Sequence, residues 1–289
     1  MSQLLLSPQW NTRRASPIVK WAGGKGALLA QFKPFFPKRD VYYRYFEPFA
    51  GGAAIFFYLQ PDHSFLYDLN PHLIEVYTVV RDDVDNLIVA LKEHYNDRDY
   101  FYAIRAQQPA VLTPVQRAAR FIFLNRTCYN GLYRVNRQDQ FNVPFGKYKN
   151  PTICDEHGLR LASQVLQHTQ LNVADFEAVL DIAESGDFLY FDPPYEPLSH
   201  TSNFTSYTSN GFTRADQHRL AATFRTLDAR GCLLMLSNSN TPLIHELYQG
   251  FSIHLIKARR AINSNPNGRG VIQELLITNL HYCPMQSAW

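Results

Sequence analysis

The chain of 289 residues is long enough for one catalytic domain that carries a smaller inserted module. Its 46% hydrophobic and 18% charged residues, without any low-complexity tract, are typical of a globular protein and exclude a disordered chain. The net charge of +3 does not by itself indicate nucleic-acid binding, and no signal peptide or membrane-spanning apolar run is present, so we expect a cytoplasmic protein without membrane association.

Short apolar runs alternate with helical patterns over most of the chain. Predicted strands occupy 42–47, 65–68, 171–175, 188–192 and 232–237. Alternation of this kind indicates βαβ units, so the expected fold class is α/β with a largely parallel, Rossmann-like sheet.

Acids stand at the ends of four of these strands, namely Glu47, Asp68, Asp175 and Asp192. Ligands of open parallel sheets bind beyond the carboxyl ends of the strands, so we expect these acids to line one edge of the sheet. Any one of them could instead be a helix N-cap.

The pattern turns helical between 71 and 154. Thr113 to Gln116 forms a capping box that opens a helix through about Arg126, and extended residues on both sides of 136–140 predict a β-hairpin within 132–145. We therefore expect a catalytic domain in two parts, 1–70 and 155–289, with a helical insertion at 71–154.

The positive charge of the chain is concentrated in this insertion. Residues 98–150 hold nine Lys and Arg but only two acids, whereas the rest of the chain is acidic overall. Such a block is what a phosphate-binding surface requires, although a solvated basic face has the same composition.

The four cysteines are widely spaced and have no histidines near them at zinc-ligand spacing. We therefore expect no metal site, and reduced thiols at Cys128, Cys154, Cys232 and Cys283.

A glycine-rich turn, Glu47 to Ala53, follows the first predicted strand. Glycine lets the backbone approach a ligand closely, and Asp68 lies 17 residues beyond Gly51, where nucleoside-binding folds place a carboxylate on the ribose. The turn predicts a nucleoside cofactor, without choosing between NAD and S-adenosylmethionine. A packing turn with a capping aspartate is the alternative.

The tetrapeptide Asp192, Pro193, Pro194 and Tyr195 ends the fourth predicted strand. Its prolines have no N–H, so the backbone becomes a rigid row of hydrogen-bond acceptors. The Asp192 carboxylate and the Pro193 carbonyl could each accept a hydrogen of adenine N6, freeing the nitrogen lone pair for attack on a methyl group. Tyr195 would stack on the base once it has left the duplex.

These stretches together resemble the Dam group of DNA adenine methyltransferases, of the α class. The resemblance extends from Ile18 to about Ile277 and rests on KWAGGK (20–25), YFEPFAGGAA (45–54), YDLN (67–70), YNGLYRVN (129–136), QFNVPFGKYKNP (140–151), FDPPY (191–195) and LSNSN (236–240). By itself KWAGGK is a weak motif, since it is not a phosphate-binding P-loop.

The resemblance implies site-specific methylation of adenine N6 in double-stranded DNA, with S-adenosylmethionine as donor and S-adenosylhomocysteine as product. The residues expected at the cofactor are Trp21, Lys25, Glu47, Phe49, Gly51, Asp68, Asp175, Phe176 and Asp192. Tyr129 and Asn130 are expected to enter the DNA stack beside the target base. The residues expected to read bases are Lys20, Leu132, Arg134, Pro144 and Tyr148.

Arg134 is the best candidate for guanine recognition, because its fork fits O6 and N7. A core position for Tyr129 and a phosphate contact for Arg134 are the alternatives. GATC is the expected target and GATATC its rival, because Thr127 and Cys128 differ from an aromatic-glycine pair in enterobacterial Dam, and 260–270 looks variable. Residues 199–211 would order around the flipped base or form a plain surface loop.

Other activities are compatible with part of the sequence. Methylation of RNA shares the chemistry, and so does methylation of protein glutamine, but the enzymes that act on glutamine carry Asn in place of Asp192. A non-catalytic DNA-binding regulator is opposed by the intact tetrapeptide. A cognate restriction endonuclease would be a functional rather than a physical partner, and a monomer or a dimer is expected.

Overall fold

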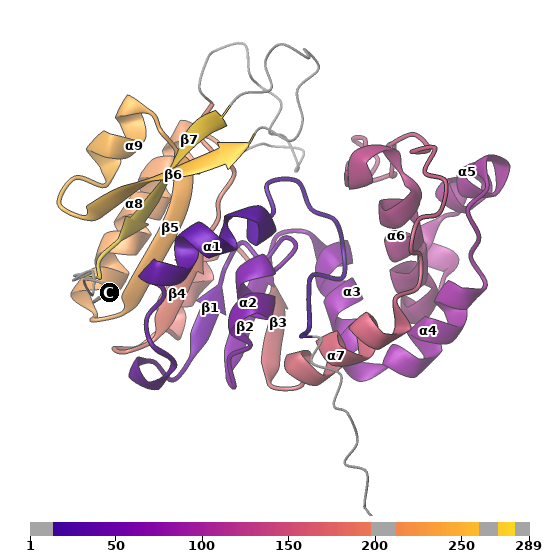
Figure 1. Ribbon diagram of the computed structural model, residues 1–289, viewed down its shortest axis with the longest axis horizontal. Helices are drawn as coiled ribbons and strands as arrows, with labels where there is room; N and C mark the ends of the chain where they lie inside the picture. The colour runs from indigo at the N-terminus through magenta and orange to yellow at the C-terminus, as the bar shows by residue number, and fades with distance from the viewer. Residues whose placement is uncertain (1–13, 198–211, 260–270, 281–289) are drawn as a thin grey trace, which may run out of the picture.

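A seven-stranded sheet organises the chain, for which the computed structural model describes residues 14–197, 212–259 and 271–280 (Figure 1). The strand order is β3-β2-β1-β4-β5-β7-β6. The strands are β1 (Tyr45–Glu47), β2 (Ser64–Asp68), β3 (Thr169–Val173), β4 (Phe188–Phe191), β5 (Leu233–Ser239), β6 (Ser252–Arg259) and β7 (Val271–Thr278).

The first five strands are parallel, whereas β7 runs antiparallel to both of its neighbours, β5 and β6. The five predicted strands are confirmed, with ends that differ by one to three residues. The antiparallel pair β6 and β7 was not predicted. Its register sets Glu274 opposite Ser239, which brings a carboxylate to the end of β5.

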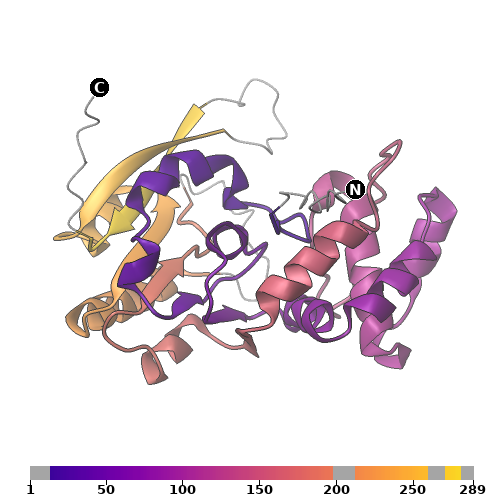
Figure 2. The same cartoon turned by 60° about the horizontal axis from the view of Figure 1, so that its bottom comes forward.

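Helices cover both faces of the sheet, as Figures 1 and 2 show. Alternate strand residues point to opposite faces, so Tyr45 and Tyr190 pack with α1 (Leu29–Phe32) and α2 (Ala54–Leu59). Phe46 and Phe191 pack on the other side. That side is covered by η6 (Phe176–Asp181), α8 (Arg214–Ala229) and α9 (Pro242–Leu247).

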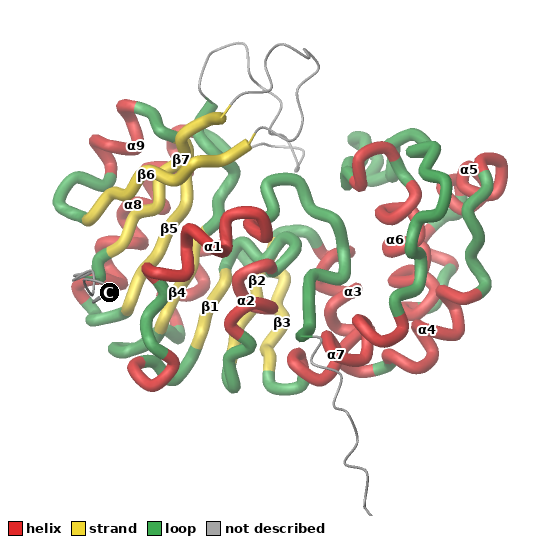
Figure 3. The backbone as a smooth tube through the Cα atoms, viewed as in Figure 1, coloured by secondary structure: helices red, strands yellow, loops and turns green. Residues whose placement is uncertain are grey.

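A group of five helices lies beyond β3 at one edge of the sheet (right in Figure 3). It consists of α3 (Pro71–Asp82), α4 (Val84–Lys92), α5 (Arg98–Ala106), α6 (Pro114–Thr127) and α7 (Glu156–Leu166). The predicted capping box opens α6, since the Thr113 hydroxyl accepts from Gln116 N and the Gln116 side chain accepts from Thr113 N. Arg117 forms a bidentate pair with Glu75 that ties α6 to α3.

The expected hairpin after α6 is present only as two isolated antiparallel bridges, Cys128 with Phe145 and Val135 with Phe141. The intervening turn is closed by Asn136 N, which donates to the Gln140 carbonyl at 2.9 Å. Pro144 has no N–H to continue the ladder, which is one reason why no regular strand forms here.

The outer edge of β6 is covered by a side chain from α1. Gln31 Nε2 donates to the Lys257 carbonyl at 2.8 Å, and Gln31 Oε1 accepts from Lys257 N at 3.0 Å. The amide thus replaces a neighbouring strand, which protects the edge from pairing with another chain. Of the helices that the structure describes, none is long and apolar enough to cross a membrane.

Candidate functional site

The predicted cofactor and catalytic residues lie at the carboxyl ends of β1, β2, β3 and β4 or in the loops that follow them, together with residues of the segment before α1. A network of side-chain contacts connects them. The described residues contain no group of three or more His, Cys, Asp or Glu side chains placed to hold a metal ion.

The glycine turn after β1 is fixed by Asp68 at the end of β2. Gly51 N donates to Asp68 Oδ2 and Asn70 N to Oδ1, both at 2.9 Å. Burial raises the pKa of the Asp68 carboxyl, while these two backbone donors oppose the rise. A carboxylate and a glycine turn are therefore held side by side.

Trp21 packs directly against this turn. Gly51 has φ +45°, and a Cβ at this position would lie 2.7 Å from Trp21 Cδ1. Tyr133 stacks on the indole with 5.7 Å between ring centroids. The turn therefore needs glycine for two reasons, its backbone conformation and the indole above it.

Glu47 is turned into the protein and is only 2% exposed. Its Oε2 accepts from the Tyr45 hydroxyl at 2.8 Å and from Phe56 N, in the first turn of α2, at 3.1 Å. Burial raises the pKa of Glu47 to about 8, against the lowering effect of these hydrogen bonds and of Lys25. Glu47 thus anchors the helix that follows the glycine turn.

Phe49 and Phe176 supply stacked aromatic surfaces, with ring centroids 5.4 Å apart and an interplanar angle of 24°. Asp175 precedes Phe176 and caps η6 by accepting from Glu177 N at 3.0 Å. Arg219 of α8 donates to the same Asp175 oxygen at 3.1 Å and lies over the Phe176 ring.

Two side chains contact the same carboxylate oxygen of Asp192. Lys25 Nζ lies 2.7 Å from Asp192 Oδ1, and the Ser237 hydroxyl donates to the same atom at 2.8 Å. Lys25 is only 5% exposed, and it also donates to the Gly23 carbonyl at 2.6 Å. The carboxylate is therefore fixed in orientation and partly neutralised.

Tyr195 is oriented by a residue of β7. Its hydroxyl donates to Glu274 Oε2 at 2.8 Å, and Lys25 Nζ lies 4.9 Å from the centre of its ring. Burial, followed by the charges of Asp192 and Glu274, raises the pKa of Tyr195 well above its usual value. Tyr195 is therefore a neutral phenol, and its hydroxyl donates the hydrogen bond to Glu274.

Polar side chains from α8 and β5 hold the backbone of the tetrapeptide. Gln217 Nε2 donates to the Pro194 carbonyl at 3.0 Å, and Asn238 Nδ2 donates to Gln217 Oε1 at 3.0 Å. Asn238 Oδ1 accepts from Glu196 N, and the Ser239 hydroxyl donates to the Glu196 carbonyl. The side chains of Gln217, Asn238 and Ser239 are buried, as is Glu196, so the turn has little freedom to move.

Gln217, Ser237 and Glu274 were not among the predicted site residues. The stretch LSNSN (236–240) has four polar residues, and three of them, Ser237 to Ser239, have partners in or next to the tetrapeptide. The signal in the sequence was an unusual run of polar residues at the end of a buried strand.

A second cluster surrounds the loop after α6. Lys20 exchanges two hydrogen bonds with Asn125, through Lys20 N at 2.7 Å and the Lys20 carbonyl at 2.8 Å. Its ammonium lies 4.3 Å from the centre of the Tyr148 ring, and its stem would contact a Cβ at Gly131. Burial and nearby Arg126 lower the pKa of Lys20.

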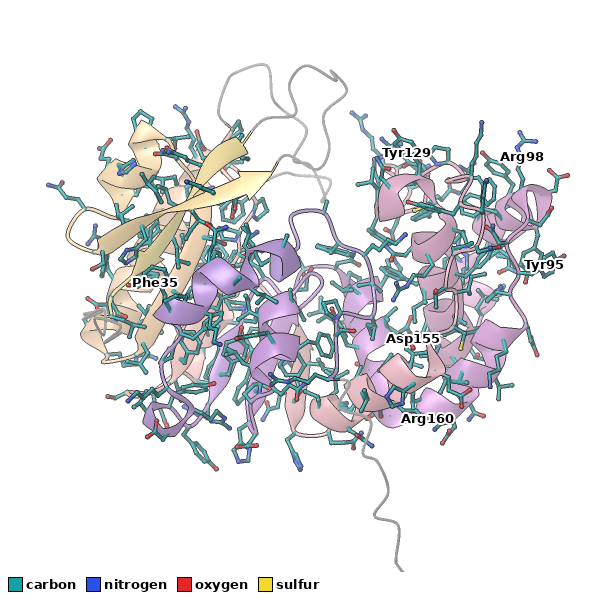
Figure 4. All side chains as sticks on the ribbon, in the orientation of Figure 1. Phe35, Tyr95, Arg98, Tyr129, Asp155 and Arg160 are labelled. Atoms are coloured by element: carbon teal, nitrogen blue, oxygen red, sulfur yellow. The ribbon has the colours of Figure 1, made fainter. Side chains whose placement is uncertain are left out.

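Tyr129 and Asn130 lie at the exposed end of α6 (Figure 4 labels Tyr129). The Tyr129 side chain is 54% exposed, so it is not the core residue that the alternative interpretation required. Asn130 has φ +55°, a left-handed conformation that Asn tolerates better than most residues. Tyr129 N donates to the Pro144 carbonyl, which joins the two arms of the loop.

Arg134 is exposed on the same loop, and its Nε donates to Asn142 Oδ1 at 2.7 Å. Leu132 lies between this arm and Cys128, whose thiol donates to the Leu132 carbonyl. The structure therefore brings all seven predicted DNA-contacting residues to one loop and its immediate surroundings.

The basic block divides into two classes. Arg105, Arg117, Arg120 and Arg126 are half-buried and donate to protein groups. Arg98, Arg134, Arg137, Lys147 and Lys149 are exposed. Roughly half of the predicted basic surface thus stabilises the helical group, and the remainder is free to face a partner.

Comparison with known proteins identifies relatives along almost the whole chain. A family model described as "D12 class N6 adenine-specific DNA methyltransferase" matches residues 21–262. The chain is 42% identical to the type II methyltransferase M1.LlaDCHI of Lactococcus lactis subsp. cremoris, over 94% of this chain and 98% of the relative.

Two further relatives are similar over comparable lengths. The type II methyltransferase M.MjaIII of Methanocaldococcus jannaschii is 43% identical, over 91% of this chain and 98% of the relative. The DNA adenine methylase of Escherichia coli (strain K12) is 36% identical, over 90% and 93%.

Proposed function

The chain belongs to the D12 class of N6 adenine-specific DNA methyltransferases, and from that premise we propose that it methylates a flipped-out adenine within GATC or a related site, with S-adenosylmethionine as donor. The observation that supports the proposal most directly is the tetrapeptide Asp192 to Tyr195, held rigidly at the carboxyl end of β4.

The residues around the glycine turn suit S-adenosylmethionine. Gly51 lets the Trp21 indole approach the turn closely, and Asp68 offers a carboxylate for the ribose hydroxyls. Phe49 and Phe176 offer aromatic surfaces for the adenine ring, with Asp175 beside them to accept from its amino group. The donor supplies an electrophilic methyl on a sulfonium, whose carbon–sulfur bond breaks as the new bond to nitrogen forms.

Trp21, Lys25 and Glu47 are further residues of the proposed cofactor site, and each contributes in a different way. Trp21 packs on the turn, and Glu47 anchors the helix behind it. Lys25 lies between the turn and Asp192, so it faces both the cofactor and the base.

The tetrapeptide suits an exocyclic amine. Adenine N6 is a poor nucleophile because its lone pair is delocalised into the ring. An Asp192 oxygen and the Pro193 carbonyl can each accept a hydrogen bond from one N–H of the amine, which draws the nitrogen towards tetrahedral geometry and frees the lone pair. The proton that the nitrogen loses on methylation would pass to the Asp192 carboxylate. The Pro194 carbonyl accepts from Gln217, whereas no donor from the described residues reaches the Pro193 carbonyl, which is therefore a candidate acceptor for the substrate.

Tyr195 provides the surface on which the flipped base stacks. Unstacking a base costs a few kcal/mol, and an aromatic partner returns part of that cost. Because Glu274 holds the Tyr195 hydroxyl, the ring is fixed before the base arrives.

The loop after α6 is the proposed DNA reader, within a recognition module at 71–154. Tyr129 and Asn130 would fill the space that the base vacates, and Arg134 would read a guanine. Lys20, Leu132, Pro144 and Tyr148 surround that loop and would contact the remaining bases. The hydrogen bond from Arg134 Nε to Asn142 Oδ1 restricts the orientation of the guanidinium.

The target and the biological role also belong to the proposal. Relatives named type II methyltransferases favour a role beside a restriction endonuclease, and those named DNA adenine methylase favour a solitary role. GATC is the proposed site and GATATC its rival, for a protein that acts as a monomer.

The test is transfer of label from tritiated S-adenosylmethionine to duplex DNA that contains GATC. We expect incorporation at adenine that is lost when the site is changed. A protein that shifts this DNA in a gel yet transfers no label would be a non-catalytic regulator instead.

Asp192→Ala is expected to abolish transfer while DNA affinity stays within a few-fold of wild type, because Asp192 acts on the reacting amine. Single-turnover rates and gel-shift affinities measure the two effects separately. Turnover equal to wild type would contradict the proposed mechanism.

A further inference from the structure

The two oxygens of Asp192 are in different environments. Oδ1 forms an ion pair with Lys25 Nζ at 2.7 Å and accepts a hydrogen bond from the Ser237 hydroxyl at 2.8 Å. Among the described residues, no protein donor reaches Oδ2. One oxygen is therefore occupied by the protein, and the other has no donor from the part of the chain that the structure describes.

Ser237 is itself held by a second hydroxyl, that of Tyr190, at 2.9 Å between the two oxygens. A serine hydroxyl has one proton, and an ionised carboxylate cannot donate. Because Ser237 donates to Asp192, Tyr190 must be the donor to Ser237. The hydrogen bonds thus run in one direction: Tyr190 donates to Ser237, and Ser237 donates to Asp192.

Rigid elements carry both hydroxyls. Tyr190 lies on β4 and Ser237 on β5, which pair directly, and both side chains are fully buried. The nearby Tyr195 hydroxyl, which also contacts Ser237, donates its own proton to Glu274. The chain of hydroxyls is therefore insulated from water and joined to the ring that would receive the base.

We propose that Tyr190 and Ser237 form a hydroxyl relay that positions Asp192, so that Oδ1 is held by the protein and Oδ2 is presented to the target amine. The proposal deepens the proposed function and rests on it. Tyr190 and Ser237 are positioning residues, since neither touches the substrate.

The proposal differs from a merely structural role in what each hydroxyl should do to the reaction. A hydroxyl that only satisfies a buried partner affects folding stability. One that orients Asp192 affects the methyl-transfer step, while the affinities for cofactor and DNA are kept. The relay also makes the effect of Tyr190 depend on Ser237.

The experiment compares Ser237→Ala, Tyr190→Phe, the double variant and Ser237→Thr, which restores a hydroxyl. Ser64→Ala is the matched control. The Ser64 hydroxyl is also buried and lies 2.8 Å from the Thr169 hydroxyl, but Ser64 begins β2, at the opposite end of that strand from Asp68. Single-turnover methylation is measured at saturating cofactor and DNA, and the dissociation constants of both ligands are measured separately.

We expect Ser237→Ala to slow the transfer step about 10- to 100-fold, as for loss of a hydrogen bond to a charged group. Tyr190→Phe should slow it less, about 3- to 10-fold, because Ser237 can still donate. The double variant should equal Ser237→Ala, Ser237→Thr should recover most of the rate, and Ser64→Ala should leave the rate unchanged.

Several outcomes would overturn the relay. Independent, multiplicative losses in the double variant would show that Tyr190 does not act through Ser237. Weaker ligand binding at an unchanged transfer rate would show a role in binding instead. An equal loss of rate in Ser64→Ala would show a general effect of buried hydroxyls.

A readout without DNA or cofactor separates this inference from the proposed function. In protein labelled with ¹³C at the aspartate carboxyls, the Asp192 signal is identified by its absence from Asp192→Asn. Ser237→Ala should shift this signal, and Tyr190→Phe should shift it less. No shift in Ser237→Ala refutes the relay even in an active enzyme. A wild-type protein without adenine methylation refutes the proposed function, and the shifts still decide the relay.

Discussion

Glu47 is expected to make the protein less stable as the pH rises, and Glu47→Gln should remove that loss. The carboxyl is fully buried beside Tyr45, Phe56 N, Lys25 and Asp192, and its folded-state pKa is raised to about 8 from an ordinary 4.5. The folded state therefore holds the proton more tightly than the unfolded state. The resulting stabilisation is complete below pH 4.5 and is lost as the pH rises through about 8.

The size of the effect follows from linkage. Each pH unit between the two pKa values costs about 1.4 kcal/mol, so the whole shift corresponds to roughly 4 to 5 kcal/mol. Other groups titrate in the same range, so the comparison is made between variants. Gln resembles the protonated carboxyl in shape and stays neutral, which should flatten the dependence.

The assay is urea-induced unfolding of wild type and Glu47→Gln at pH 5.5 and 8.5. Glu246→Gln is the control, because Glu246 is exposed on α9. Between the two pH values, wild type should lose at least about 2 kcal/mol more than Glu47→Gln does. Parallel losses in both proteins would refute a protonated Glu47.

Two other substitutions test the recognition loop and the cofactor turn. Arg134→Ala should cost about 1–3 kcal/mol of binding on the cognate site and relax discrimination at one base pair in competition assays, whereas an equal loss on all sequences would indicate a phosphate contact. Gly51→Ala should weaken S-adenosylmethionine binding at least tenfold in titration calorimetry, because its Cβ would lie 2.7 Å from Trp21 Cδ1. Gly186→Ala has a positive φ but open space around it, and equal cofactor binding by the two variants would contradict this reasoning.

Much of the fold could be predicted because it depends on local patterns. Four of the five parallel strands, β1, β2, β4 and β5, are largely buried runs, whereas β3 is mostly exposed; the capping box at Thr113 is a local motif. Strands β6 and β7 could not be predicted from local patterns, because they pair across the stretch 260–270. The stretches 199–211 and 260–270, on which further expectations rested, lie outside the described residues.

The site was predictable where one short motif carries the chemistry, and less so where partners come from distant segments. Asp192 was recognised from its tetrapeptide, but Ser237 is 45 residues away and Glu274 is 79 residues from Tyr195. Whether a basic residue faces solvent depends equally on tertiary contacts. Arg120 and Arg134 both belong to the basic block, and the sequence does not distinguish them, yet of these two only Arg134 is exposed.

The central claim is tested most directly by mapping modified bases on DNA of mixed sequence after incubation with the purified protein and S-adenosylmethionine. The account predicts N6-methyladenine at one recurring short site, GATC or a relative of it, and none with Asp192→Ala. Methylation at cytosine, methylation scattered without a common site, or modification that persists in Asp192→Ala would contradict it.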